Sequence, residues 1–258
     1  MEGTTSCRLL FGCLSDPQFK KKSVCLVTAI NAVSCKNYGL AKDIVSLYPY
    51  ADVAGIRYTK PGVSYACQRD RGTTGTVILN DPPSEEHTDD PVVATLITQY
   101  GIGDSIETNL YARNSVQYSL DLHHVNNLRE DTEDKRLTDF CSSMKELKEK
   151  LSKCEFDHIE YVLLPLGIGR RGKIDKMWLA YYLPCIFTFS HELEGKTVCF
   201  VANENVFSSL DVKFKGNVVM SNLLKPLKEL QVMNNFVNCT ENGEDTCGAD
   251  RPPFEYQY

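Results

Sequence analysis

The sequence has little of what marks secreted, membrane or zinc-binding proteins. It contains no CxxC pair, so the close ligand spacing of a zinc cluster is missing. Residues 1–13 lack the charged start and the apolar stretch of a secretory signal. The longest apolar segment, residues 177–189, contains Pro184 and is shorter than the roughly 20 residues of a membrane span. These absences predict a soluble intracellular protein, cytoplasmic or nuclear, with no membrane partner and no metal.

An excess of basic charge is missing as well. The formal net charge is −6 and the sequence pI is about 5.5. Binding to a nucleic-acid backbone normally needs Lys and Arg clustered over a broad face. The densest basic run, Lys20 to Lys22, is interpreted as a solvated loop. We therefore expect no long nucleic acid as a partner.

Cysteine is abundant, but its distribution does not favour a disulfide framework. The eleven cysteines are scattered through apparent core strands, as Cys25 and Cys199 illustrate, and no signal peptide accompanies them. Reduced and mostly buried thiols are expected. Hydrophobic residues make up 42% and charged residues 24% of the chain, which is ordinary for a protein with a packed core.

Apolar runs and helical periodicity alternate along the chain. Apolar, β-branched runs predict strands within residues 7–14, 23–33, 75–79, 92–100, 159–166 and 197–202. Apolar residues at helical spacing predict helices within residues 39–48, 131–154 and 174–193, the last with a kink at Pro184. This alternation favours a mostly parallel sheet between helices, with ligands at the carboxyl ends of the strands. Residues 1–205 are predicted to form a nucleotide-binding domain, and residues 206–258 a partly ordered C-terminal extension.

Small or amide residues follow three of the predicted strands. The first turn runs from Asn31 to a helix that opens at Gly39, the second is Tyr100-Gly101-Ile102-Gly103, and the third is the Gly167–Gly172 loop. Glycine lets backbone N–H groups approach a phosphate closely, and a helix N-terminus adds a favourable dipole. Each glycine pair alone is also compatible with a plain tight turn. Together the three turns predict an anion cradle.

At these residues the sequence resembles a known family. The segments Cys7–Leu14, Val24–Ser34, Gly39–Lys42 and Leu163–Gly169, the last followed by Trp178, look like the successive signatures of macro domains. The subgroup it resembles most contains terminal ADP-ribose glycohydrolases and ADP-ribose-1″-phosphate phosphatases. The resemblance implies a three-layer α/β/α macro-like fold with a mostly parallel, mixed central sheet. It also implies ADP-ribose or an ADP-ribosylated protein as the partner, and no cofactor.

The resemblance assigns roles to individual residues. Asn31 would face the distal ribose, and Gly39 and Leu40 would open a helix near the pyrophosphate. A phosphate-wrapping loop would contain Gly167, Ile168, Gly169 and Arg170. Independently of the family, Tyr100 beside Gly101 and Gly103 is suited to packing on a ribose or base, and a core tyrosine is the alternative. Arg170 and Arg171 either pair a phosphate or sit in solvent.

The sequence also departs from the family pattern. Cys13 stands where many macro domains have an acid that recognises adenine, and Asp16 in the adjoining loop is a candidate substitute for that acid. Tyr38 places bulk in a loop that is glycine-rich in relatives, which predicts a narrowed or reshaped crevice. Val45 and Ser46 occupy the positions of the lysine nucleophile of the glycohydrolase subgroup, so covalent lysine catalysis is not expected.

Two hypotheses about function follow. In the first, the protein binds ADP-ribose or an ADP-ribosyl derivative and hydrolyses it as a metal-independent ADP-ribosyl hydrolase. Asp175 is then the general base that activates water, although capping of the helix that begins there is the favoured alternative for this residue. In the second, the protein is a catalytically inactive macro-like reader or sequestering protein for ADP-ribose or another nucleotide.

Overall fold

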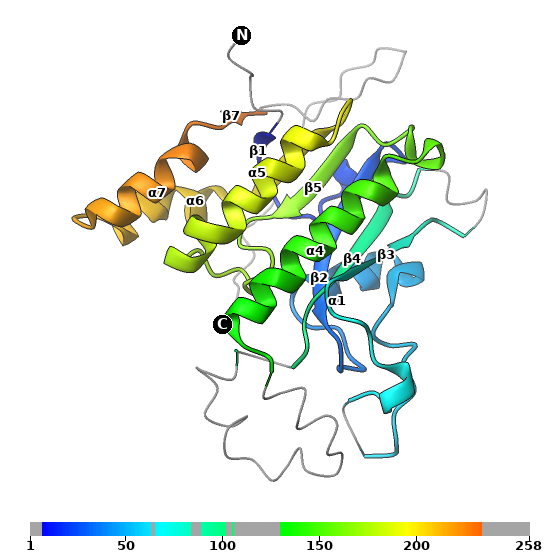
Figure 1. The fold of residues 1–258 in the computed structure, drawn as a ribbon. Coiled ribbons are helices and arrows are strands. Elements are labelled where there is room, and N and C mark those ends of the chain that lie inside the picture. The colour runs from blue at the N-terminus through cyan, green and yellow to red at the C-terminus, as the bar shows by residue number, and fades with distance from the viewer. Residues whose placement is uncertain (1–6, 63–64, 84–88, 102–104, 106–129, 234–258) are drawn as a thin grey trace, which may run out of the picture.

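The computed structural model describes residues 7–62, 65–83, 89–101, 105 and 130–233 (Figure 1). Seven strands form one sheet in the order β3-β4-β2-β5-β6-β1-β7. Within the described residues β3 pairs antiparallel with β4, and the other neighbouring strands pair in parallel. The strands are β1 (Cys7–Phe11), β2 (Val24–Asn31), β3 (Thr76–Asn80), β4 (Val92–Gln99), β5 (Tyr161–Pro165), β6 (Thr197–Ala202) and β7 (Gln231–Val232). The predicted mixed, mostly parallel sheet is confirmed.

Both faces of the sheet are covered, which explains why its central strands are apolar throughout. Along β2, Val24 and Leu26 pack with residues of α1 (Leu40–Leu47) in one cluster. Cys25 and Val27 belong to a second cluster, which holds residues of α4 (Glu133–Leu151) and α5 (Leu183–Glu192). Figure 1 shows α4 and α5 across one face and α1 behind the other. The predicted three-layer α/β/α arrangement is confirmed.

Helix α4 follows directly from its sequence. Thr132 caps it, because its hydroxyl accepts a hydrogen bond from the Lys135 N–H at 3.1 Å. Phe140, Met144 and Leu147 repeat at helical spacing and are buried against the sheet. The start of α4 therefore has a fixed position above the carboxyl end of β4, with which the helix makes its main contacts.

A π-helical turn precedes Pro184, the residue at which the sequence predicts a kink. Residues Trp178–Tyr182 are π-helical, and the Leu183 N–H donates to the Trp178 carbonyl, one residue further back than in an α-helix. Pro184 follows this turn directly, at the start of α5, in a helix that continues without a break from one segment into the other. The Trp178 indole N–H donates to the Ile168 carbonyl at 3.0 Å, so this helical region is tied to the loop that follows β5.

Residues beyond position 205 contribute to the same core. Helices α6 (Glu204–Lys213) and α7 (Val218–Lys228) place Phe207, Leu210 and Leu224 in the α4–α5 cluster. Strand β7 then pairs with β1 at the edge of the sheet. The boundary at residue 205 stays a prediction, but the described part of the extension packs against the sheet. No helix in the described part of the chain is both long and apolar enough to cross a membrane.

All nine cysteines within the described residues are free, in agreement with the reduced state expected from the sequence. Burial raises the pKa of Cys7, Cys25 and Cys199 to about 12, so these thiols stay protonated at neutral pH. The expectation that most cysteines are buried was wrong. Five more are partly exposed and Cys154 is exposed, because they lie in loops and on helix faces rather than in strands.

Candidate functional site

A cavity of about 590 Å³ opens at the carboxyl ends of β2, β4 and β5. This is the edge at which open α/β sheets bind ligands, and the volume lies in the usual range for small-molecule sites. The lining residues come from the ends of these strands, the segment before α1 and the loop after β5. They are Thr28, Ala29, Ile30, Asn31, Lys36, Tyr38, Gly39, Leu40, Ala41, Thr98, Gln99, Pro165, Leu166, Ile168, Gly169, Arg171 and Gly172.

Asn31 lines this cavity at the end of β2, as the sequence predicted. The register between β2 and β4 shifts between Ile30 and Asn31, which leaves Thr98 unpaired and in the cavity wall. The Asn31 Oδ1 accepts hydrogen bonds from the N–H groups of Val33 at 3.0 Å and Ser34 at 2.6 Å. The side-chain amide of Asn31 is thereby oriented, and its NH₂ donors are left for other partners.

A buried arginine binds the backbone carbonyls of the same turn. Arg57 is 8% exposed, and its Nη1 donates to the carbonyls of Asn31 at 2.9 Å and Ser34 at 3.0 Å. Burial lowers the pKa of Arg57, although the group remains a cation at neutral pH. The sequence did not identify Arg57, because nothing local links an arginine in an irregular segment to a strand end far back in the chain.

Helix α1 begins at the cavity with no side chain capping it. Gly39 is the N-cap residue, with φ 54° and ψ −138°, a backbone conformation that glycine adopts readily. A Cβ atom at Gly39 would meet open space, so the backbone is accessible there. The first N–H groups of a helix have no acceptor within it and favour an anion. Gly39 and Leu40 both line the cavity, as the resemblance implied.

The loop after β5 forms the opposite wall. Its residues Gly167, Gly169, Arg171 and Gly172 all have positive φ angles between 55° and 81°. A Cβ atom at Gly167 would lie 2.5 Å from the Gly172 backbone, and one at Gly169 would lie 2.7 Å from the Phe140 ring. Glycine is required at both positions because of these close approaches. Ile168 and Gly169 line the cavity, whereas Gly167 closes the loop by accepting the Gly172 N–H at 3.1 Å.

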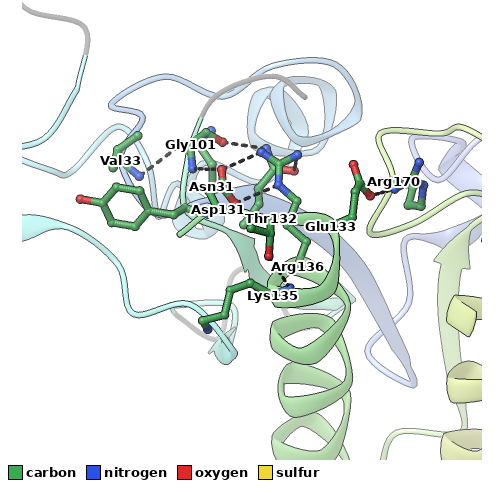
Figure 2. A network of polar contacts seen from close by, with 11 residues as sticks. Asn31, Val33, Gly101, Asp131, Thr132, Glu133, Lys135, Arg136 and Arg170 are labelled. Atoms are coloured by element: carbon green, nitrogen blue, oxygen red, sulfur yellow. Dashed lines mark hydrogen bonds and ion pairs between the residues drawn. The ribbon is translucent and has the colours of Figure 1, made fainter. Parts of the chain in front are cut away.

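The backbone amides of the turn after β4 bind a side chain of the protein itself. The Asp131 carboxylate accepts the N–H of Gly101 at 2.8 Å and the N–H of Tyr100 at 3.3 Å. Arg136 donates to both oxygens of the same carboxylate, from Nε at 2.9 Å and from Nη2 at 2.7 Å. Figure 2 shows Asp131 between Gly101 and the start of α4. An internal anion therefore takes the amides that the sequence assigned to a ligand phosphate.

Neither Tyr100 nor Gly101 is among the residues that line the cavity. The Tyr100 hydroxyl accepts a hydrogen bond from Nη1 of Arg71 at 3.0 Å. Gly103 lies outside the described residues. Of the three predicted turns, the structure brings together the first and the third, and the described part of the second is directed elsewhere.

Arg170 and Asp175 contact each other instead of the cavity. Arg170 pairs with Glu133 at the start of α4, as Figure 2 shows, and its Nη2 lies 2.8 Å from Asp175 Oδ2. The other Asp175 oxygen accepts the Trp178 N–H at 2.9 Å, which is the capping alternative for this residue. Interaction with Asp175 and Glu133 raises the pKa of Arg170 against the opposing effect of burial. The sequence suggested a phosphate or solvent as the partner of Arg170, and the structure shows two carboxylates.

The charged side chains in the described lining of the cavity are basic and exposed. Lys36 and Arg171 are the charged members of the lining, and within the described residues the lining contains no acid, histidine or cysteine. Tyr38, which is 54% exposed, also lines the cavity, and the narrowing of the crevice by its ring stays a prediction. The deeper residues Thr28, Thr98 and Gln99 are polar but uncharged. The described part of the lining is therefore basic at its exposed edge and neutral in its deeper part.

The first strand ends away from this lining. Asp16, suggested as a substitute for the adenine-recognising acid, accepts the Cys13 N–H at 2.7 Å and so closes its own turn. Neither residue lines the cavity. Among the described residues, no group of three or more His, Cys, Asp or Glu side chains is placed to hold a metal ion.

Of the comparisons with known proteins, the one with solved structures gives matches. No family model and no curated protein matches the chain. Among solved structures, a macrodomain mutant from Oceanobacillus iheyensis is similar, with 15% identity over 86% of this chain and 92% of that one, and a TM-score of 0.47. Alphavirus P23pro-zbd is similar with 14% identity over 88% of this chain and a TM-score of 0.41. This chain spans about a quarter of the length of that alphavirus chain, 25%.

Proposed function

We propose that this chain is a macro-type domain whose cavity binds ADP-ribose or an ADP-ribosyl derivative. One observation carries the proposal: the uncapped start of α1 and the glycine loop after β5 face each other across one cavity. Both present backbone amides, and backbone amides at a helix start and in a glycine loop are suited to a diphosphate. The resemblance of the sequence to macro domains supports the identity of the ligand.

Titration calorimetry with ADP-ribose tests the binding. We expect saturable heat and thermal stabilisation, since a ligand at a hundred times its Kd adds about 2.7 kcal/mol to the free energy of unfolding. ADP and ribose 5-phosphate serve as matched partial ligands and should bind more weakly. Absence of heat and of stabilisation at millimolar ADP-ribose would overturn the proposal.

We propose further that binding, and not hydrolysis, is the function of the described cavity. The supporting observation is the lining, which contains no carboxylate and no histidine within the described residues. A general base must come within hydrogen-bond reach of the water it activates. Asp175 remains the predicted base of the hydrolase hypothesis, but both of its oxygens are engaged, by Arg170 and by the Trp178 N–H.

Incubation with ADP-ribose-1″-phosphate and with an ADP-ribosylated protein separates the two hypotheses. We expect binding of either substrate without turnover. Release of phosphate or of ADP-ribose by the wild-type protein would instead assign a hydrolase. In that case Asp175→Asn tests the predicted base: loss of turnover with retained binding would support it, and unchanged turnover would exclude it.

A further inference from the structure

Helix α4 packs against α5 and the π-helical turn before it, away from the cavity (Figure 1). At one end of this contact, the ring centroids of Phe140 and Tyr182 lie 4.9 Å apart. About two turns further along, Lys148 Nζ on α4 donates to Glu192 Oε2 on α5 at 2.7 Å, between residues 44 positions apart in the chain. The two helices therefore run in the same direction, in a register that brings residues of this separation together.

That register places two cysteines opposite each other. Cys141 on α4 and Cys185 on α5 lie between the two contacts and are also 44 positions apart. Both side chains are partly buried and pack against the main core cluster. Their thiols are hydrogen-bonded to each other. Because both helices are held by the core, rotation of the side chains is the main movement needed to bring the sulfurs to the roughly 2.05 Å of a disulfide.

The two thiols differ in acidity. The Cys185 S–H donates to the Cys141 sulfur, which lowers the pKa of Cys141 to about 7 against the opposing effect of burial. The same hydrogen bond, together with burial, raises the pKa of Cys185. At pH 7 about half of Cys141 is therefore thiolate, while Cys185 keeps its proton. The thiolate is the reactive form of cysteine, so the pair contains a nucleophile and an adjacent protonated thiol.

We propose that Cys141 and Cys185 are a reversible redox pair that reacts with a peroxide and closes a disulfide between α4 and α5. Cys141 attacks one oxygen of hydrogen peroxide, the O–O bond breaks, and the leaving hydroxide takes up a proton to give water. The Cys185 sulfur then attacks the Cys141 sulfenic acid, the S–O bond breaks, and the hydroxide leaves with the Cys185 proton as a second water. The two sulfurs together lose two electrons, which reduce the peroxide.

The reverse step needs two molecules of a small thiol, which reduce the disulfide by exchange and become a disulfide themselves. The inference concerns a part of the molecule away from the cavity, and it does not depend on the proposed function.

Peptide mapping of the native protein after treatment with hydrogen peroxide tests the proposal. Trypsin releases residues 137–145 and residues 177–196 as separate peptides, each with a single cysteine. We expect them to appear joined, with two hydrogen atoms fewer than the free peptides, and to separate again after dithiothreitol. Protein oxidised in urea is the control and should give mixed pairings among its cysteines. Separate, unlinked peptides from native protein whose other cysteines are oxidised would overturn the proposal.

Three variants test the role of each thiol. Cys185→Ser should stop at a sulfenic acid that dimedone traps on residues 137–145, because the second thiol is missing. Cys141→Ser should leave residues 177–196 without a dimedone adduct. Cys154→Ser, at an exposed cysteine beyond α4, is the matched control and should form the same link as the wild type. A dimedone adduct on Cys185 in place of Cys141 would overturn the assignment of the nucleophile.

The pH dependence of link formation gives a readout that a purely structural thiol contact would not. With the Cys141 pKa at about 7, the rate should rise about tenfold between pH 6 and pH 8 and then level off, because the thiolate fraction saturates. Glutathione, a free thiol treated in parallel, should instead continue to gain rate above pH 8. A link that forms with the pH dependence of glutathione would contradict an activated Cys141.

Discussion

At the carboxyl edge of the sheet, the turns after β4 and β5 present their backbones to different partners. After β4, the N–H of Gly101 donates to the buried Asp131 carboxylate. After β5, Ile168 and Gly169 face a cavity whose described lining holds no acid. In the β5 loop, Gly167 and Gly169 are required because a Cβ atom would collide with the Gly172 backbone and the Phe140 ring. In one turn the anion belongs to the chain, and in the other we propose that it belongs to the ligand.

This difference indicates which side of the site is fixed and which is open. Asp131 and Arg136 are 3% and 6% exposed in their side chains and form a buried ion pair that joins the β4 turn to α4. The β5 loop is held from behind by Arg170 and by its own turns, and its front remains accessible. The turn after β4 therefore acts as a fixed support, and ligand-dependent effects should be confined to the other side of the cavity.

Removal of the internal anion should give the largest effect. In Asp131→Ala, the buried Arg136 charge loses its partner and the Gly101 N–H loses its acceptor. Breaking one side of a buried ion pair costs about 3–5 kcal/mol of unfolding free energy. Urea unfolding measures this loss, and Asp134→Ala, at an exposed position on the first turn of α4, is the control. A loss below about 1 kcal/mol in Asp131→Ala would show that the turn after β4 is as open to solvent as the turn after β5.

The two turns also show what the sequence could predict. The strand ends and the helix start are local features, so the placement of Asn31, Gly39 and Gly169 at one cavity followed from hydrophobic pattern and turn chemistry. The partner of Gly101 is Asp131, 30 residues later in the chain, and no local signal links the two. Likewise the ion pair of Arg170 with Glu133 joins residues far apart in the chain, and no local signal reveals it.

The second-largest effect concerns the open loop. Gly169→Ala places a Cβ atom 2.7 Å from Phe140 and 2.9 Å from Tyr182 in a backbone conformation with φ 80°. Overpacking and backbone strain together should cost about 2–4 kcal/mol. Gly172→Ala is the matched control, since its φ is 76° but its Cβ atom would meet nothing within 4 Å, so about 1 kcal/mol is expected. Equal losses of unfolding free energy in the two variants would contradict the close packing of Gly169.

A third substitution, at Asn31, separates the effect on stability from the effect of charge in the cavity. Asn31→Asp retains an oxygen that accepts from the Val33 and Ser34 N–H groups, so stability should change by less than about 1 kcal/mol. It replaces the NH₂ donors with negative charge inside the cavity, and affinity for ADP-ribose should fall at least about tenfold. Calorimetry and thermal unfolding on the same sample measure both quantities. Retained affinity would show that the ligand does not approach Asn31.

The smallest effect is expected at Lys36. Its loop is held by the Ser34 hydroxyl, which donates to the Lys36 carbonyl at 2.7 Å, so Lys36→Gln leaves the backbone supported. An exposed cation near a bound anion contributes little in water, and affinity should fall only about twofold to fivefold at low salt. The difference from wild type should vanish at high salt, because screening removes it. Lys42→Gln, whose residue is exposed on α1 but does not line the cavity, should show a smaller change still. Equal changes at Lys36 and Lys42 would mean that overall charge, and not the position of Lys36 at the open side, controls binding.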